Sequence, residues 1–295
     1  MINGYFDGKN NPVARKSICV YMDVLGFSEE TMDSFRSGTE SKYFDAFYKV
    51  HAKQIEEMTK SDLPKWWGVK VFTDNIVLGF PIWSGDGEAE FGSTVFTASQ
   101  YQWQMAKVGF FVRGAMTIGY LFMDDNVAFG PAIIEAHDLE QTRARDPRIV
   151  LSDAIRKLIE THLTYYAEPF DSPHNREVLE DADGVLFLNY LDEANMELEN
   201  GVAMDWDGLA DHKDYIEQNL SKYRKNPRIW AKYLWLASYH DWFVSMYTDV
   251  DGYSKNIQIA KRLARTHPEM LVKRRIKRPN KESQRTLRSE RAKRR

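Results

Sequence analysis

Short apolar runs alternate with longer amphipathic stretches along the first half of the chain. The apolar runs are bounded by Gly, Asp and Asn and predict strands, at residues 17–22, 65–73, 76–81, 110–119, 120–123, 127–129 and 149–151. The stretches with apolar residues three or four positions apart predict helices, at residues 28–58, 88–107, 131–141 and 152–165. The resulting order, β-α-β-β-α-β-β-α-β-α, favours an α/β fold with a mixed sheet and ferredoxin-like character.

The pattern changes after residue 167. A hairpin is predicted from residues 178–180 and 185–191, around Asp181-Ala182-Asp183-Gly184, and two helices follow at 205–224 and 227–247. The second helix is crowded with aromatic residues, namely Trp230, Tyr233, Trp235, Tyr239, Trp242 and Phe243. An aromatic stripe at helical spacing is typical of a core or a dimer contact, and we expect that role here in preference to a ligand cage.

These changes divide the chain into three predicted parts: a catalytic core at 1–166, a hairpin and helical extension at 167–272, and a basic tail at 273–295. The tail carries twelve Lys and Arg and two Glu, whereas the whole chain has a net charge of −3. Such a run is typical of a solvated, mobile segment. It also suits a polyanion, but no aromatic residues are interleaved to stack on bases, so a nucleic-acid partner is disfavoured.

Composition excludes several classes of protein. A hydrophobic content of 43% and an aromatic content of 13% provide a core and argue against disorder. The single cysteine, Cys19, rules out a disulfide framework and a cysteine zinc site. The N-terminus lacks a signal pattern and no stretch approaches eighteen apolar residues, so we expect a cytoplasmic protein without a membrane partner.

The strongest chemical signal is a pair of aspartates at strand ends. Asp23 ends the first apolar run, and Asp74 lies between the two strands of the predicted hairpin. Each alone is typical of turn chemistry. Together they predict carboxylates that converge on divalent cations, and two such cations can clamp the attacking and leaving oxygens of a phosphoryl transfer. Gly26, just after Asp23, allows main-chain amides to approach an anion.

Four segments extend this signal into a set of motifs. They read Asp23-Val24-Leu25-Gly26-Phe27, Lys70-Val71-Phe72-Thr73-Asp74, Arg113-Gly114-Ala115-Met116-Thr117-Ile118-Gly119, and Phe129-Gly130 through Ala136 to Leu139-Glu140. Over residues 17–165 the chain thereby resembles the class III nucleotidyl cyclases. With Ala136-His137-Asp138-Leu139-Glu140 and Asp146-Pro147-Arg148-Ile149-Val150, it is most similar to the antiphage pyrimidine cyclases of the bacterial Pycsar systems.

The resemblance implies a function and partners. Those enzymes convert UTP or CTP to the 3′,5′-cyclic monophosphate and pyrophosphate, and a separate effector protein reads the product. It implies a homodimer whose two chains share each active site. It also implies two Mg²⁺ or Mn²⁺ ions per site, held by Asp23, Asp74 and the Val24 carbonyl, which are oxygen ligands suited to these cations. The amides of Leu25, Gly26 and Phe27 would receive the triphosphate.

The chain departs from the purine cyclases of this family at two positions. Their ribose-orienting Asn and transition-state Arg correspond to Ile134 and Asp138, which cannot donate the same hydrogen bonds. Four arginines are candidates for phosphate recognition, Arg113 first among them, with Arg143, Arg145 and Arg148.

The base site departs as well. Lys70 occupies the base-reading lysine position, and its acidic partner is replaced by Val127. A lysine only donates, so it suits a carbonyl oxygen of uracil better than the amine of cytosine. An unmatched buried polar group costs about 1–3 kcal/mol, which favours UTP. We therefore expect a uridylate cyclase; the alternatives are a cytidylate cyclase and a degenerate nucleotide sensor.

Overall fold

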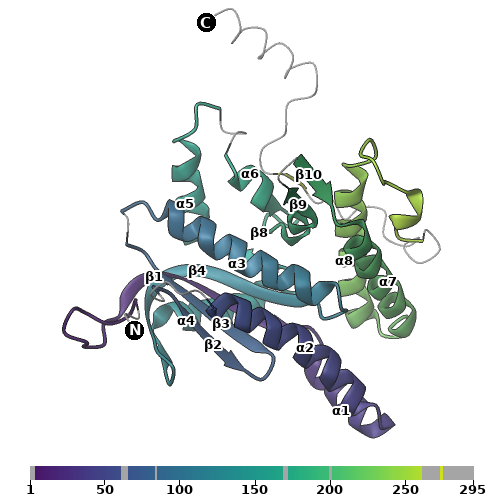
Figure 1. Ribbon diagram of the computed structural model, residues 1–295, viewed down its shortest axis with the longest axis horizontal. Helices are drawn as coiled ribbons and strands as arrows, with labels where there is room; N and C mark the ends of the chain where they lie inside the picture. The colour runs from purple at the N-terminus through teal and green to yellow at the C-terminus, as the bar shows by residue number, and fades with distance from the viewer. Residues whose placement is uncertain are drawn as a thin grey trace, which may run out of the picture.

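The computed structural model describes residues 4–60, 66–83, 85–168, 172–198, 201–260 and 273–274. One twisted sheet runs through the molecule, and helices cover both of its faces (Figure 1). Its strands are β1 (Arg15–Val24), β2 (Gly68–Phe72), β3 (Asn75–Pro81), β4 (Val112–Met123), β5 (Ala128–Phe129), β6 (Ile149–Leu151), β7 (Val178–Glu180), β8 (Leu186–Leu188) and β11 (Lys273–Arg274). The predicted mixed α/β fold is confirmed.

The order of the strands is β11-β7-β8-β6-β4-β1-β3-β2, and β5 pairs with β4 off this path. The four strands β4-β1-β3-β2 are all antiparallel to their neighbours, which is the split β-α-β-β-α-β arrangement of the ferredoxin-like fold. Strand β6 pairs in parallel with β4, and β8 and β7 continue the sheet in antiparallel orientation. The sheet therefore runs across the predicted boundary at residue 166.

The helices are α1 (Phe27–Ser37), α2 (Glu40–Thr59), α3 (Glu88–Ala106), α4 (Pro131–Arg143), α5 (Asp153–Leu163), α6 (His174–Glu177), α7 (Trp206–Lys222) and α8 (Pro227–Ser245). Alternation along β1 separates two cores. Ile18, Val20 and Met22 pack with α3 and α5 on one face, and Cys19 packs with α4 on the other. Asp23 follows the alternation of Cys19 and therefore lies on the α4 face.

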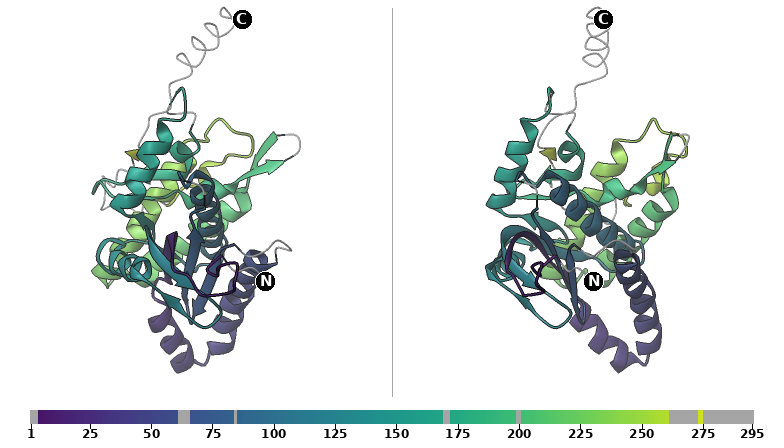
Figure 2. Two further views of the ribbon diagram at one scale, coloured as in Figure 1. Left: turned by 90° about the vertical axis from the view of Figure 1, so that its left-hand side faces the viewer. Right: turned by 60° about the vertical axis from the view of Figure 1, so that its left-hand side comes forward.

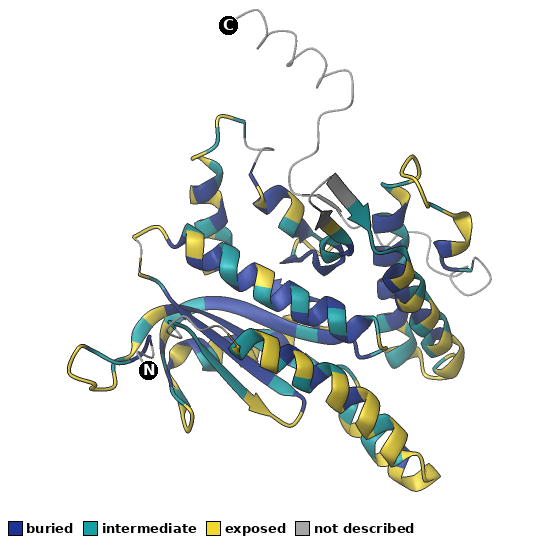
Figure 3. Cartoon of the chain, viewed as in Figure 1, coloured by how far each residue is buried: buried dark blue, intermediate teal, exposed yellow. Residues whose placement is uncertain are grey.

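The helix expected at 28–58 is two helices, because Gly38 ends α1 in the left-handed conformation with φ 69°. The α1–α2 pair projects from the body, and much of its surface is exposed (Figures 2 and 3). Ser152 caps α5 as predicted, its side chain accepting a hydrogen bond from the Ile155 amide.

The C-terminal extension adds a second aromatic core. This core buries three aromatic residues of α8, Trp235, Tyr239 and Phe243, together with Phe111, the residue before β4. The aromatic stripe is therefore core, as predicted. A second hairpin, β9 (Asn195–Leu198) with β10 (Gly201–Met204), and the short helix α6 were not predicted.

Most of the predicted basic tail lies outside the described residues; Lys273 and Arg274 pair with β7. Within the part of the chain that the structure describes, no helix is both long and apolar enough to cross a bilayer.

Candidate functional site: two carboxylates at a sheet edge

Strand β1 ends at the first predicted carboxylate. Asp23 and Val24 are its last residues, and α1 begins at Phe27 after Gly26, which has φ 74°. Only glycine adopts this conformation without strain, so the tight turn depends on it. No side chain caps the first turn of α1. The Leu25 amide donates to the Phe111 carbonyl at 2.8 Å. The Leu25 amide is therefore used within the main chain. Of the three amides predicted to bind the triphosphate, those of Gly26 and Phe27 remain.

The second carboxylate lies in the β2–β3 turn. Phe72 pairs with Asn75, which makes Thr73 and Asp74 the turn residues. Thr73 has φ 53°, an uncommon conformation for a β-branched residue, and its hydroxyl donates to Asp74 Oδ1 at 2.9 Å. Backbone strain of this kind is often found beside functional side chains. Asp74 is 8% exposed, so the turn aims its carboxylate inward.

The structure brings Asp23 and Asp74 together from positions fifty-one residues apart in sequence. The pKa of Asp74 is raised to about 6, first by burial and then by the charge of Asp23 and a hydrogen bond between the two carboxyl groups. Like charges held this close disfavour ionisation of both groups. The side chains therefore share one environment.

Arg113 lies beside this pair. It stands directly opposite Asp23 in the β1–β4 ladder, and its Nε and Nη2 donate to Asp23 Oδ2 at 3.0 and 2.9 Å. On its other side the Nε lies 2.9 Å from Glu140 Oε1 of α4. The Glu140 side chain is fully buried, and that burial raises its pKa while Arg113 lowers it. Arg113 thus bridges the partly exposed carboxylate of Asp23 and the buried carboxylate of Glu140.

Two further residues complete the surroundings of the pair. The Tyr21 hydroxyl donates to Asn75 Oδ1, and its ring meets the His137 ring edge-on with centroids 5.2 Å apart. Burial, followed by the negative charges of Asp23, Glu140 and Asp74, raises the pKa of Tyr21 to about 12. The Tyr21 hydroxyl is therefore uncharged at neutral pH, and the side chain lines the site.

The pair suits divalent cations with oxygen preference. Two carboxylates that repel each other, one of them nearly buried, are stabilised when a cation neutralises them. Among the described residues no group of three or more His, Cys, Asp or Glu forms a complete metal cage. Further ligands would therefore come from main-chain oxygens such as that of Val24, from water and from a phosphate-bearing substrate.

Lys70 is held elsewhere. Its Nζ donates to the main-chain carbonyls of Asp124, at 3.5 Å, and Asp125, in the loop between β4 and β5. Val127 in the same loop is 47% exposed. The predicted base-reading position thus contacts the β4–β5 hairpin, and none of its described bonds reaches Asp23 or Asp74.

The substituted family positions lie on the outer surface of α4. Ile134 is 64% exposed, and the Asp138 side chain is also exposed. Arg143 and Arg145 are exposed, whereas Arg148 is buried and bound to Asp181 and Asp183. Arg148 is therefore a structural residue, which corrects its candidacy for phosphate recognition.

Sequence reasoning missed Glu140 and Asn75. Glu140 closes the Leu139-Glu140 motif, and its place on the inner face of α4 is a signal that helical spacing from Ala132 and Ala136 could have supplied. Asn75 directly follows Asp74, and nothing in the sequence links it to Tyr21.

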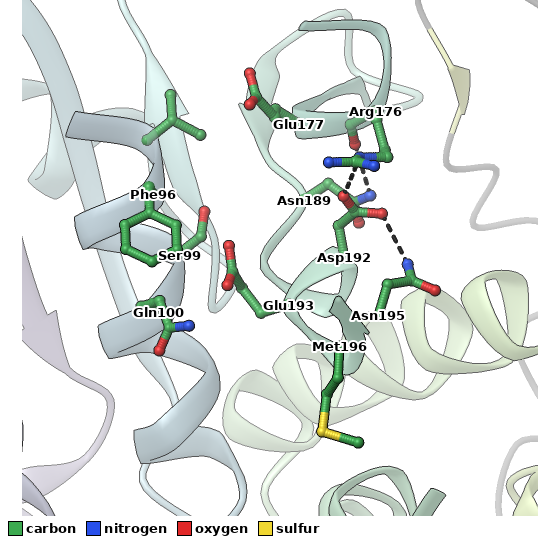
Figure 4. Close-up of a pocket in the computed structure, with 11 residues that line it drawn as sticks. Phe96, Ser99, Gln100, Arg176, Glu177, Asn189, Asp192, Glu193, Asn195 and Met196 are labelled. Carbon is green, nitrogen blue, oxygen red and sulfur yellow. Dashed lines mark hydrogen bonds and ion pairs between the residues drawn. The ribbon is translucent and has the colours of Figure 1, made fainter. Parts of the chain in front are cut away.

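A separate cavity of about 440 Å³ lies between α3 and residues 176–196 (Figure 4). Its walls carry Glu193, whose pKa is raised to about 7 by burial and by Asp192, and the Arg176–Asp192 ion pair with Nε and Oδ2 2.7 Å apart. It shares no residue with the Asp23–Asp74 pair.

Comparisons with known proteins give distant structural likeness only. No protein-family model and no curated protein matches the chain. The chain is similar to the crystal structure of a class III adenylyl cyclase-like ATP-binding protein from Pseudomonas aeruginosa, with a TM-score of 0.38 and 11% identity. The similarity covers 50% of this chain and 35% of that one. We therefore base the functional proposal on the side chains of this chain.

Proposed function

We propose that the protein is a pyrimidine nucleotide cyclase that converts UTP to 3′,5′-cyclic UMP and pyrophosphate. The observation that carries the proposal is the convergence of Asp23 and Asp74 beside Arg113 at one edge of the sheet. A pair of repelling carboxylates with an adjacent guanidinium suits a metal-bound triphosphate, because it offers ligands for cations and donors for phosphate oxygens.

The residues would act by holding and orienting the substrate. Asp23, Asp74 and the Val24 carbonyl would bind two Mg²⁺ or Mn²⁺ ions, which when bound stabilise charge on the attacking 3′-oxygen and on the leaving pyrophosphate. The Gly26 and Phe27 amides, at the positive end of α1, would receive phosphate oxygens. Arg113 would exchange its bond to Asp23 for one to the polyphosphate while Glu140 keeps it in place.

Two observations support a homodimer with shared sites. Lys70 contacts the β4–β5 hairpin and not the carboxylate pair, so a base-reading role requires a second chain. Large apolar side chains on the neighbouring elements are also strongly exposed, namely Phe72, Tyr120, Val127, Phe129 and Ile134. Exposed apolar residues of this size are typical of protein interfaces.

The preference for uridine follows from the chemistry of Lys70. Its ammonium already donates to carbonyl oxygens, and uracil would offer it another, whereas the cytosine amine would oppose donor to donor. Cytidylate cyclase activity is the alternative within the same reaction. The role as a second-messenger synthase in antiphage defence, with a separate effector, is supported by the sequence resemblance alone.

A second candidate is a nucleotide sensor without turnover. It is favoured by Ile134 and Asp138 at the positions of the missing Asn and Arg, and by the Arg113–Asp23 bond, which competes with a metal. The retained carboxylate pair argues against it, because binding alone does not need two repelling acids.

Incubation of the purified protein with Mn²⁺ and each of UTP, CTP, ATP and GTP, followed by product chromatography, tests these readings. Cyclic UMP with stoichiometric pyrophosphate is the expected result. Predominant cyclic CMP would select the alternative specificity, and predominant cyclic AMP would refute the pyrimidine assignment. Bound but intact nucleotide would establish the sensor.

A further inference from the structure

We propose that helix α8 supplies a polyphosphate-binding cation, Lys232, to the Asp23–Arg113 site of the same chain. The C-terminal extension would thus complete the anion site in cis. The proposal rests on the proposed function in one respect, namely that the natural ligand is a nucleoside triphosphate. The position and charge of Lys232 are independent of that assumption.

The α7–α8 junction is anchored to helix α1, which begins four residues after Asp23. Glu30, in the first turn of α1, accepts bonds from the Lys222 ammonium and the Tyr223 hydroxyl. The Tyr223 ring stacks on Tyr233 of α8 with centroids 5.8 Å apart. The Tyr233 ring in turn meets Phe111 edge-on at 5.8 Å. Helix α8 is therefore packed against the start of β4, two residues before Arg113.

A second contact of α8 also lies just after Lys232. The Gly114 amide, next to Arg113, donates to the Arg148 carbonyl at 3.1 Å. The Arg148 guanidinium lies 5.7 Å from the Trp235 ring of α8, three residues after Lys232. Residues three apart on a helix share a face. These contacts, one and three residues after Lys232, hold the part of α8 that carries Lys232 against the segments next to Arg113.

The charges around Lys232 point to an anion. Lys232 is half-buried, and within the described chain it has no acidic partner closer than 4 Å. Its pKa is lowered first by burial and then by the positive charge of Arg113, with a further contribution from Arg228. Asp146 and Glu140 act in the opposite direction without reversing the shift. A half-buried ammonium beside a guanidinium is destabilised until an anion joins them.

The ligand class follows from the neighbouring groups. Arg113 uses its Nε and Nη2 atoms for Asp23 and Glu140, so its Nη1 donors have no bond among the described residues. Arg113 and Lys232 would therefore bind the outer phosphates of a polyphosphate, and its inner phosphate would lie near Asp23 and Asp74. A polyphosphate offers separate anionic groups to these two cations and to cations held by the carboxylates, so it is the ligand class that we infer.

Calorimetric titration of inorganic tripolyphosphate with Mn²⁺ tests the site without any turnover. Lys232→Met keeps an unbranched aliphatic side chain and removes the charge. We expect it to weaken tripolyphosphate binding by about tenfold or more, and to raise KM for UTP by a similar factor with a smaller change in kcat. Lys232→Arg should restore most of the binding.

Lys225→Ala, an exposed lysine in the α7–α8 turn, is the matched control and should bind as the wild type does. Unchanged binding by Lys232→Met, or equal losses in Lys225→Ala, would overturn the proposal. The two proposals fail separately. If Lys232→Met weakens tripolyphosphate binding but the wild type cyclises no nucleotide, the anion site stands and the cyclase proposal fails. If the wild type cyclises UTP and Lys232→Met changes neither KM nor tripolyphosphate binding, the cyclase proposal stands and the role of Lys232 fails.

Discussion

Two arginine clusters lie next to each other in this molecule, and they differ in how their charges are balanced. Arg148 is buried and bound to Asp181 and Asp183, and the Trp235 indole also donates to Asp181 at 2.6 Å. Arg113 is 21% exposed and lies between Asp23 and Glu140, with Asp74 adjacent.

We propose that this difference separates a structural cluster from a functional one. The Arg148 cluster joins β6, the β7–β8 turn and α8 through paired charges, so there is little reason for it to rearrange. The Arg113 cluster keeps two carboxylates in mutual repulsion and a lysine without a close acid. Unfavourable arrangements of this kind persist where a ligand relieves them.

The largest expected effect is on turnover at the Arg113 cluster. Asp23→Ala and Asp74→Ala each remove a proposed metal ligand, and we expect cyclic-nucleotide formation to fall by about a thousandfold or more. Single-turnover assays with Mn²⁺ and UTP measure this. Near wild-type rates from a folded variant of either kind would show that the carboxylates do not bind the catalytic cations.

The second prediction compares the loss of each arginine, in stability and in turnover. Arg148→Met leaves Asp181 buried without its charge partner, so we expect the free energy of unfolding to fall by about 3–5 kcal/mol. Arg113→Met should cost less stability, because Asp23 lies near solvent and the buried Glu140, whose pKa is raised by burial, can take up a proton. It should strongly reduce turnover. Urea unfolding and kcat/KM measure the two effects. Equal stability losses in both variants would remove the distinction between the clusters.

The third prediction concerns the pH dependence of stability, which we expect from a buried histidine pair, His212 and His240, away from both arginines. His240 donates from Nε2 to the Ile257 carbonyl at 2.9 Å, so its Nδ1 accepts from the Nδ1 of His212, also at 2.9 Å. Burial lowers the pKa of His240 to about 4, and burial together with the charge of His240 lowers that of His212 well below its usual value. Both rings are neutral in the folded protein.

Because the folded pKa values lie below the unfolded value of about 6.5, the unfolded state takes up protons first. Stability is therefore complete above pH 6.5 and falls between about pH 6.5 and 4, by about 1.4 kcal/mol per pH unit for each histidine. Urea midpoints at pH 7, 6 and 5 measure this loss. His240→Gln should flatten the dependence, and His137→Gln, at an exposed position, should leave it unchanged.

The smallest expected effect is a gain in stability. The raised pKa of Asp74 means that its ionised form is unfavourable in the folded protein above about pH 6. Asp74→Asn keeps the shape and removes the charge, so we expect it to stabilise the metal-free protein by about 1 kcal/mol at pH 7.5. Thermal unfolding measures the gain, and added Mn²⁺ should raise the melting temperature of the wild type more than that of the variant.

Much of the fold was predictable because its signals are local. The apolar runs of β1 and β3, the Ser152 cap and the aromatic stripe of α8 each lie within one stretch of sequence. The break at Gly38 was missed, since helical periodicity continues across it in α1 and α2. The β9–β10 hairpin was missed although its sequence carries a signal, because residues 195–199 alternate polar and apolar side chains and the dipeptide Asn200-Gly201 favours a hairpin turn.

By itself, the sequence determined the elements and placed Asp23 and Asp74 at strand ends beside turns. The tertiary structure decided which distant residues meet: Asp74 at Asp23, Glu140 behind Arg113, and α8 across the start of β4. The physical reason is that strand order and helix docking depend on contacts between residues far apart in the chain. Local propensity carries no information on such contacts, and burial and charge balance select among them only once the chain is folded.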